Sequence, residues 1–165
     1  MDCVQFKISD IKYGWIFATI ETQEEQIAIS NSYLGGLQMP RVFLKAIIEL
    51  LDKKEHEKWI CWHGESNSYI WYLKVKDESL ELCIYEGGSS FGLPLEGELL
   101  SKMTEVSRMI LETNTLLYLF AVSICDALKF YSYGKGYDIW QSSRYKDLFP
   151  RTELSQLRKL LRGRR

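Results

Sequence analysis

Three short runs of strand-forming residues, separated by short polar turns, constrain the fold of this chain more than any other feature. Residues 58–63, 69–76 and 80–85 are rich in aromatic and aliphatic side chains, and the segments GESNS and KDES lie between them. Strands joined by so few residues pair with their neighbours in antiparallel order. The sequence therefore predicts an antiparallel meander in the middle of the chain.

More strands are expected before this meander. Residues 4–11 alternate loosely, residues 13–21 are apolar on both faces, and residues 26–30 follow after the polar segment TQEE. This pattern is typical of three strands joined by tight connections. The N-terminal part of the chain is therefore predicted to contribute strands as well.

Two later segments are less regular. Residues 104–113 fit the spacing of both a helix and a strand, and we favour the strand because Asn114 or Thr115 would then cap the helix that follows. Residues 86–97, EGGSSFGLPLEG, contain four glycines and are predicted to form the most flexible loop. We expect the working surface to lie on this loop or on an exposed part of the sheet.

Three segments carry apolar side chains at helical spacing. Residues 41–52 form an amphipathic pattern, residues 116–131 are apolar over most of their circumference, and residues 152–161 carry four leucines on one face. Together with the strands they predict one α+β domain spanning residues 1–165. We expect one antiparallel sheet of six or seven strands, with helices 41–52 and 116–131 packed on one face and helix 152–161 docked at the edge.

Length and composition agree with one soluble domain. The 165 residues are 46% hydrophobic and 13% aromatic, which suffices for a core. The four cysteines lack CxxC spacing, as is typical of free thiols in a reducing compartment. No signal peptide is recognisable, and the uncharged runs at residues 26–40 and 113–125 are both shorter than the roughly 20 residues of a membrane-spanning helix. We predict a cytoplasmic protein without a membrane partner.

The stretch WICWHGE places a thiol, an imidazole and a carboxylate at alternate positions, Cys61, His63 and Glu65. In an extended strand, Cys61 and His63 would lie about 6.6 Å apart along the backbone, and Cys61 and Glu65 about 13 Å apart. Zinc bonds are about 2.0–2.3 Å long, so one ion would not reach all three groups without a sharp bend. A metal site and a Cys–His nucleophile pair are the alternatives, and we favour a strand end whose His63 and Glu65 could border a small-molecule pocket.

Signatures of the common enzyme classes are missing from the chain. The patterns GxGxxG, GxxxxGK[ST] and HExxH do not occur, and GSSFG at residues 88–92 matches GxSxG in its letters only, because these glycines do not open a helix after a strand at the required spacing. We therefore expect no cofactor and no metal, assign no catalytic residues, and favour a protein without enzymatic activity.

Charge is unevenly distributed along the chain. The net charge is −1, yet residues 144–165 carry eight Lys or Arg against two acidic residues, so the body of the chain is acidic. A basic tail at residues 158–165 contains Arg158, Lys159, Arg162, Arg164 and Arg165. Such a cluster can bind nucleic-acid phosphates, but cations also stabilise the C-terminus of a helix through its dipole. We favour the second role.

The C-terminal segment YSYGKGYDIWQSSRYKDLFPRTELSQLRKLL resembles the pattern "YG…GY…W…FP…L..L" of a family of small uncharacterised bacterial proteins. The segments SYLGGL, FLKAIIELL and WHGESNSYIWYL follow in that family's order. The RYKDL segment before Pro150 is longer than the pattern expects. The resemblance implies a compact α/β domain of bacterial origin, and it carries over no activity.

Large side chains follow the predicted helix 116–131, which Gly134 and Gly136 are expected to end. Tyr137, Trp140 and Phe149 are predicted to be structural anchors that hold the last helix on the body. Ligand recognition by these three side chains is the lesser alternative.

These observations favour a non-catalytic binding protein. Its expected partner is another protein, and an immunity-type protein that masks a toxin is the specific version, because an acidic body suits a basic active site. One alternative is a nucleic-acid-associated protein that uses the basic tail. The other is a small-molecule enzyme or sensor with a pocket near His63 and Glu65.

Overall fold

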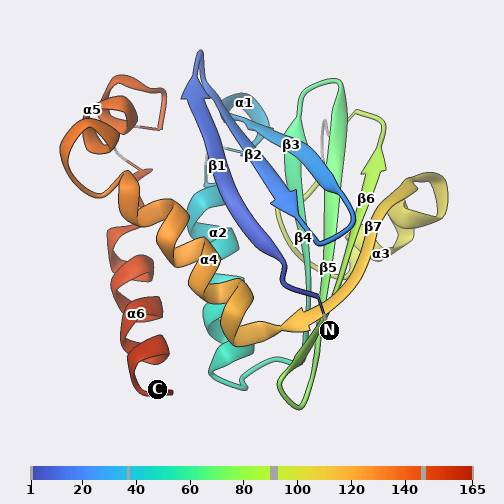
Figure 1. Ribbon diagram of the computed structural model, residues 1–165. Coiled ribbons are helices and arrows are strands. Elements are labelled where there is room, and N and C mark those ends of the chain that lie inside the picture. Colours follow the sequence, from blue (N-terminus) through green and yellow to red (C-terminus); the bar gives the residue numbers. More distant parts are fainter. Residues whose placement is uncertain (1, 37, 90–92, 146–147, 165) are drawn as a thin grey trace.

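The structure is a computed structural model that describes residues 2–36, 38–89, 93–145 and 148–164, and its fold is α+β (Figure 1). The elements follow the order β1 (Gln5–Lys12), β2 (Trp15–Glu21), β3 (Gln26–Ser32), α1 (Tyr33–Gly36), α2 (Met39–Leu51), β4 (Glu57–Gly64), β5 (Asn67–Lys76), β6 (Ser79–Gly87), α3 (Leu99–Met103), a 3-10 turn (Thr104–Val106), β7 (Arg108–Leu116), α4 (Leu117–Phe130), α5 (Gly134–Ser142) and α6 (Arg151–Arg162).

The strands form two sheets, so the prediction of a single sheet of six or seven strands is wrong. β1, β2 and β3 form a three-stranded antiparallel sheet, and β4, β5, β6 and β7 form a four-stranded one. The meander predicted for residues 58–85 is present as β4, β5 and β6. Residues 104–113 contain the 3-10 turn and most of β7, which agrees with the strand that we favoured.

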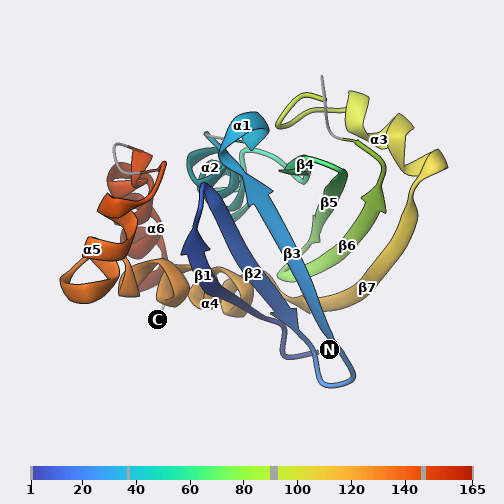
Figure 2. The ribbon, with the colours of Figure 1, turned by 90° about the horizontal axis from the view of Figure 1, so that it is seen from above.

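The two faces of the four-stranded sheet have different surroundings. Figure 2 shows β3 on one side of this sheet and α3 on the other. The inner face, on the side of β3, belongs to the main core together with β1, β2, α2 and α4. On the outer face a smaller apolar cluster forms, in which Leu100 of α3 packs with Cys61 and Ile70.

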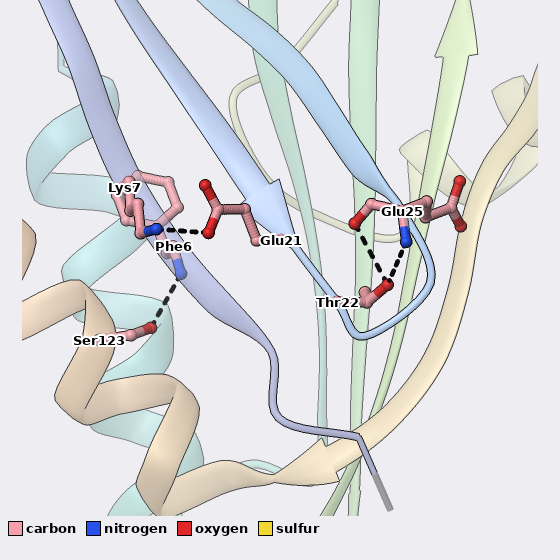
Figure 3. Close-up of polar contacts among 6 residues, drawn as sticks. All are labelled: Phe6, Lys7, Glu21, Thr22, Glu25 and Ser123. Atoms are coloured by element: carbon pink, nitrogen blue, oxygen red, sulfur yellow. Dashed lines mark hydrogen bonds and ion pairs between the residues drawn. The ribbon is translucent and has the colours of Figure 1, made fainter.

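Several strand edges are closed by other parts of the chain. The backbone N–H of Phe6 on β1 donates to Ser123 Oγ of α4 at 3.0 Å (Figure 3). The N–H groups of Cys61 and Gly97 form bonds with the carbonyls of Leu95 and Trp59, so residues 95–97 run along the edge of β4. These contacts satisfy backbone groups that would otherwise invite pairing with another chain.

The C-terminal helix packs on two other helices. α6 (Arg151–Arg162) contacts α2 and α4, so the prediction that helix 152–161 docks at a sheet edge is wrong. Its buried leucines, Leu154, Leu157 and Leu161, join the main core. Among the described residues, no helix is long and apolar enough to cross a membrane.

Two predicted helix boundaries are also wrong. Asn114 and Thr115 lie within β7 and do not cap α4, which begins directly at Leu117 and satisfies its first N–H with the carbonyl of Glu78. Gly134 and Gly136 belong to α5 and do not end α4. A Cβ at Gly136 would lie 2.1 Å from the carbonyl oxygen of Phe130, so glycine allows α5 to approach the end of α4.

Candidate functional site

The strand end that carries Cys61, His63 and Glu65 lies where β3 meets β4. Cys61 and His63 project from the outer face of β4, because they alternate with Trp62, which belongs to the main core. Glu65 lies in the turn after β4, with a φ of +40°. The chain therefore bends after Gly64, but the bend does not bring the three groups onto one point.

Cys61 is a buried core residue. It is 0% exposed, and burial raises the pKa of its thiol to about 12. Reactive cysteines and thiolate metal ligands need the deprotonated form, which a positive neighbour or a helix N-terminus normally stabilises. Cys61 has apolar neighbours instead, so its surroundings disfavour the thiolate.

Asn31 on β3 joins the two sheets beside this strand end. Its Oδ1 accepts the backbone N–H of His63 at 3.0 Å, and its Nδ2 donates to the Gly36 carbonyl at 2.9 Å and to the Tyr145 hydroxyl at 3.0 Å. The Tyr145 hydroxyl in turn donates to the Asn31 carbonyl at 2.9 Å. One buried amide therefore connects β3, β4, α1 and the segment before α6.

His63 lies between this junction and the segment at residues 93–97. It is 4% exposed, and Nε2 has no hydrogen-bond partner among the described residues. A Cβ at Gly35 would lie 2.7 Å from Nδ1, so the ring is tightly enclosed. Burial lowers the pKa of His63, and a hydrogen bond with the Pro94 carbonyl partly opposes this effect. The fold therefore favours a neutral imidazole.

We expect His63→Gln to flatten the acid limb of the stability profile. The pKa of His63 is lowered in the folded protein, so the unfolded chain binds a proton first as pH falls below about 6.5. The stability that neutral His63 contributes is complete above that pH and is lost as pH falls toward the folded pKa, at up to about 1.4 kcal/mol per pH unit. Urea unfolding at pH 7 and pH 5 measures it.

The exposed His56 provides the control for this prediction. His56→Gln should keep the wild-type difference in unfolding free energy between the two pH values. An unchanged difference in His63→Gln would show that other groups cause the acid sensitivity.

Glu65 has a structural partner as well. Its Oε1 accepts a hydrogen bond from Ser32 Oγ at 2.6 Å, which links the turn after β4 to the end of β3. Among the described residues, no group of three or more His, Cys, Asp or Glu could hold a metal ion. The contacts of His63 and Glu65 thus serve the junction of the two sheets, and Cys61 packs with Ile70 and Leu100 on the outer face.

The basic tail is partly engaged by the body of the protein. Arg158 is half-buried and interacts with Cys125 of α4, and Arg164 donates to the Leu51 carbonyl at the end of α2. Lys159 and Arg162 are exposed, and Arg165 lies outside the described residues. Two of the five predicted cations therefore hold α6 against α2 and α4.

The aromatic residues after α4 form a packed cluster. Trp140 is 0% exposed, donates from Nε1 to the Tyr145 carbonyl at 2.8 Å, and contacts Phe149 edge-on with ring centroids 5.0 Å apart. Tyr137 is half-buried beneath the guanidinium of Arg151, 5.0 Å from the ring centroid. The cluster lies immediately before α6 and supports it.

A different surface, on the outer face of the four-stranded sheet, combines aromatic and acidic side chains. The register places Glu57, Lys74 and Glu81 in one row, and Trp59, Tyr72, Cys83 and Glu112 in the next. Tyr85 follows two residues after Cys83 and points to the same side. We call this surface the acidic–aromatic face and define it by Glu57, Trp59, Tyr72, Glu81, Tyr85 and Glu112.

Burial and the carboxylates of the acidic–aromatic face raise the pKa values of two groups on it. Burial, followed by the nearby carboxylates of Glu57 and Glu81, raises the pKa of Tyr72 to about 12. Burial, Glu81 and Glu112 raise the pKa of Cys83 to about 11. The negative charge of the carboxylates therefore disfavours ionisation of Tyr72 and Cys83 at the centre of the face.

The sequence pattern predicts only part of this surface. The alternation in residues 80–85 places Glu81, Cys83 and Tyr85 on one side of a strand. Adding Glu57, Trp59, Tyr72 and Glu112 requires the register of three other strands, which the alternation does not contain.

Comparisons with known proteins leave the fold and these sites to be interpreted on physical grounds. No protein-family model, curated protein sequence or solved structure matches this chain.

Proposed function

We propose that this chain is a non-catalytic protein that binds another protein, and that an immunity-type protein masking a toxin is its specific version. The observation that carries the proposal is the acidic–aromatic face. Trp59, Tyr72 and Tyr85 are half-buried there, and Trp59 and Tyr85 pack against the cluster that contains Leu100 of α3. Aromatic side chains in a partly open, polar surround are typical of protein-binding surfaces.

The surroundings of the other candidate residues give less support to the alternatives. A small-molecule pocket at His63 would need access to a ring that is enclosed by Gly35 and residues 93–97. Among the described cations of the tail, Lys159 and Arg162 are the ones left for nucleic-acid binding, because Arg158 and Arg164 contact the body. Protein binding through the acidic–aromatic face requires neither access to the His63 ring nor the cations of the tail.

Site-specific photo-crosslinking tests the proposed function. Lys74 is exposed on the acidic–aromatic face, and Ala28 is exposed on the outer side of the β1–β3 sheet. Each is replaced in turn by p-benzoylphenylalanine, and the protein is irradiated in a lysate of its source organism. We expect a discrete protein adduct from position 74 and none from position 28, because only the first lies on the binding surface.

Competition controls the crosslinking. Excess unmodified protein should remove the adduct at position 74. The proposal fails if neither position yields an adduct, or if both positions yield the same set of proteins.

A further inference from the structure

The carboxylates of the acidic–aromatic face lack cationic partners. Glu57, Glu81 and Glu112 make no ion pair with the described residues, and Glu57 instead accepts a hydrogen bond from the Tyr72 hydroxyl at 3.2 Å. The exposed Lys74 is the single cation in these two rows of the sheet. Three carboxylates therefore face solvent against one ammonium group.

The outer side of the three-stranded sheet shows the opposite arrangement. There Lys7 pairs with Glu21, as Figure 3 shows, and Lys12 pairs with Asp10 at 2.6 Å. Trp15 and Phe17 stack on the same side, with ring centroids 6.0 Å apart. Both faces carry aromatic side chains, but only the acidic–aromatic face leaves its charge uncompensated, so only that face selects the charge of a partner.

The aromatic side chains narrow the kind of cation that fits. The rings of Trp59 and Tyr72 lie 4.3 Å apart between centroids with an interplanar angle of 30°, so they stack on each other, and the second face of Tyr72 is turned away from Trp59. Glu112 is the diagonal neighbour of Glu81 on the adjacent strand, at a backbone separation of roughly 7–8 Å. A planar guanidinium can stack on aromatic rings and bind a carboxylate through two N–H groups, whereas an ammonium is a compact point charge.

We infer that the acidic–aromatic face docks a basic surface of the partner protein by accepting an arginine side chain, which stacks on the face of Tyr72 turned away from Trp59 and pairs with Glu81 and Glu112. This inference rests on the proposed function and specifies the partner's chemistry. Glu57 orients the platform through its hydrogen bond with Tyr72. Lysine would satisfy the charge but would lose the stacking and the paired N–H contacts.

Hexaarginine and hexalysine peptides of equal charge test the inference by isothermal titration calorimetry at low ionic strength. We expect hexaarginine to bind more tightly than hexalysine by about 5-fold, because arginine adds stacking to charge attraction. Glu81→Gln combined with Glu112→Gln should weaken hexaarginine binding by about 10-fold or more. Tyr72→Leu should remove most of the preference for arginine and leave hexalysine binding within about 2-fold.

A matched control separates local recognition from net charge. Glu24→Gln combined with Glu25→Gln changes the net charge by the same amount at the exposed β2–β3 turn, away from this face, and should leave binding within about 2-fold. Near-ultraviolet circular dichroism and thermal melting verify that each variant is folded. The inference is overturned if the peptides bind equally, or if the control variant weakens binding as much as the Glu81 and Glu112 changes.

Two further outcomes show which molecule binds to the acidic–aromatic face. Self-association that increases with concentration and disappears in the Glu81 and Glu112 variant would make a second copy the occupant, and would overturn the inference. A discrete adduct at position 74 without hexaarginine binding would also overturn it, while the proposed protein-binding function would stand.

Discussion

Asn31→Ala is expected to lower the free energy of unfolding by about 3–5 kcal/mol, because each buried polar group that loses its partner costs about 1–3 kcal/mol. The change removes three hydrogen bonds: to the His63 N–H, the Gly36 carbonyl and the Tyr145 hydroxyl. All three lie in a buried region that water cannot easily enter. Urea unfolding followed by tryptophan fluorescence measures the loss.

Asn114→Ala is the matched control for Asn31→Ala. Asn114 has an exposed side chain on β7, and its replacement should change the unfolding free energy by less than about 0.5 kcal/mol. Hydrogen exchange adds a local readout, because the backbone N–H of His63 should lose protection in Asn31→Ala. A loss of less than 1 kcal/mol with unchanged protection at His63 would contradict the role of Asn31 at the junction.

Trp140→Ala is expected to destabilise the protein by about 3–5 kcal/mol, the usual range for truncating a buried tryptophan. The indole is fully buried and contacts Tyr131, Tyr145 and Phe149. Its loss leaves a cavity directly before α6. Urea unfolding again gives the free energy, and limited proteolysis should show earlier cleavage between α5 and α6.

Trp140→Phe separates the ring packing from the hydrogen bond. Phenylalanine keeps most of the aromatic contacts but leaves the Tyr145 carbonyl without its 2.8 Å donor. We expect this variant to lose about 1–2 kcal/mol. If the alanine variant lost no more than the phenylalanine variant, the aromatic cluster would not anchor the C-terminal helix.

Local patterns predicted individual elements well. The spacing of apolar residues in 41–52 and 116–131 matches α2 and α4 within a few residues, and the two short polar turns correctly indicated β4, β5 and β6. These features depend on residues that are close in sequence. Propensity and periodicity therefore contain most of the necessary information.

Relations between distant elements were predicted less well. β3 and β4 meet through the side chain of Asn31 and not through a backbone ladder, so alternation alone suggested one continuous sheet where the structure has two. The start of α4 depends on the Glu78 carbonyl in a distant turn, which no capping pattern near Leu117 reveals. In both cases a single tertiary contact overrides the local rule.

The candidate sites also combine features that local sequence predicts with features that depend on distant elements. Burial of Cys61 agrees with its place between tryptophans, whereas the acidic–aromatic face combines residues from all four strands of one sheet. The acidic excess of the body is visible in the sequence, but its position on one sheet face is not. Strand register determines which carboxylates gather there.

The two-sheet arrangement has a consequence for the order of folding. In each sheet every strand pairs with its neighbour in the chain, and apart from β6 and β7, which residues 88–107 connect, the paired strands are joined by short turns that close at low entropic cost. Another long-range step is the joining of the two meanders, at which Asn31 meets the backbone of His63. Each sheet can therefore form before the other, and the slow search for distant partners is confined to the pairing of β6 with β7 and to this encounter.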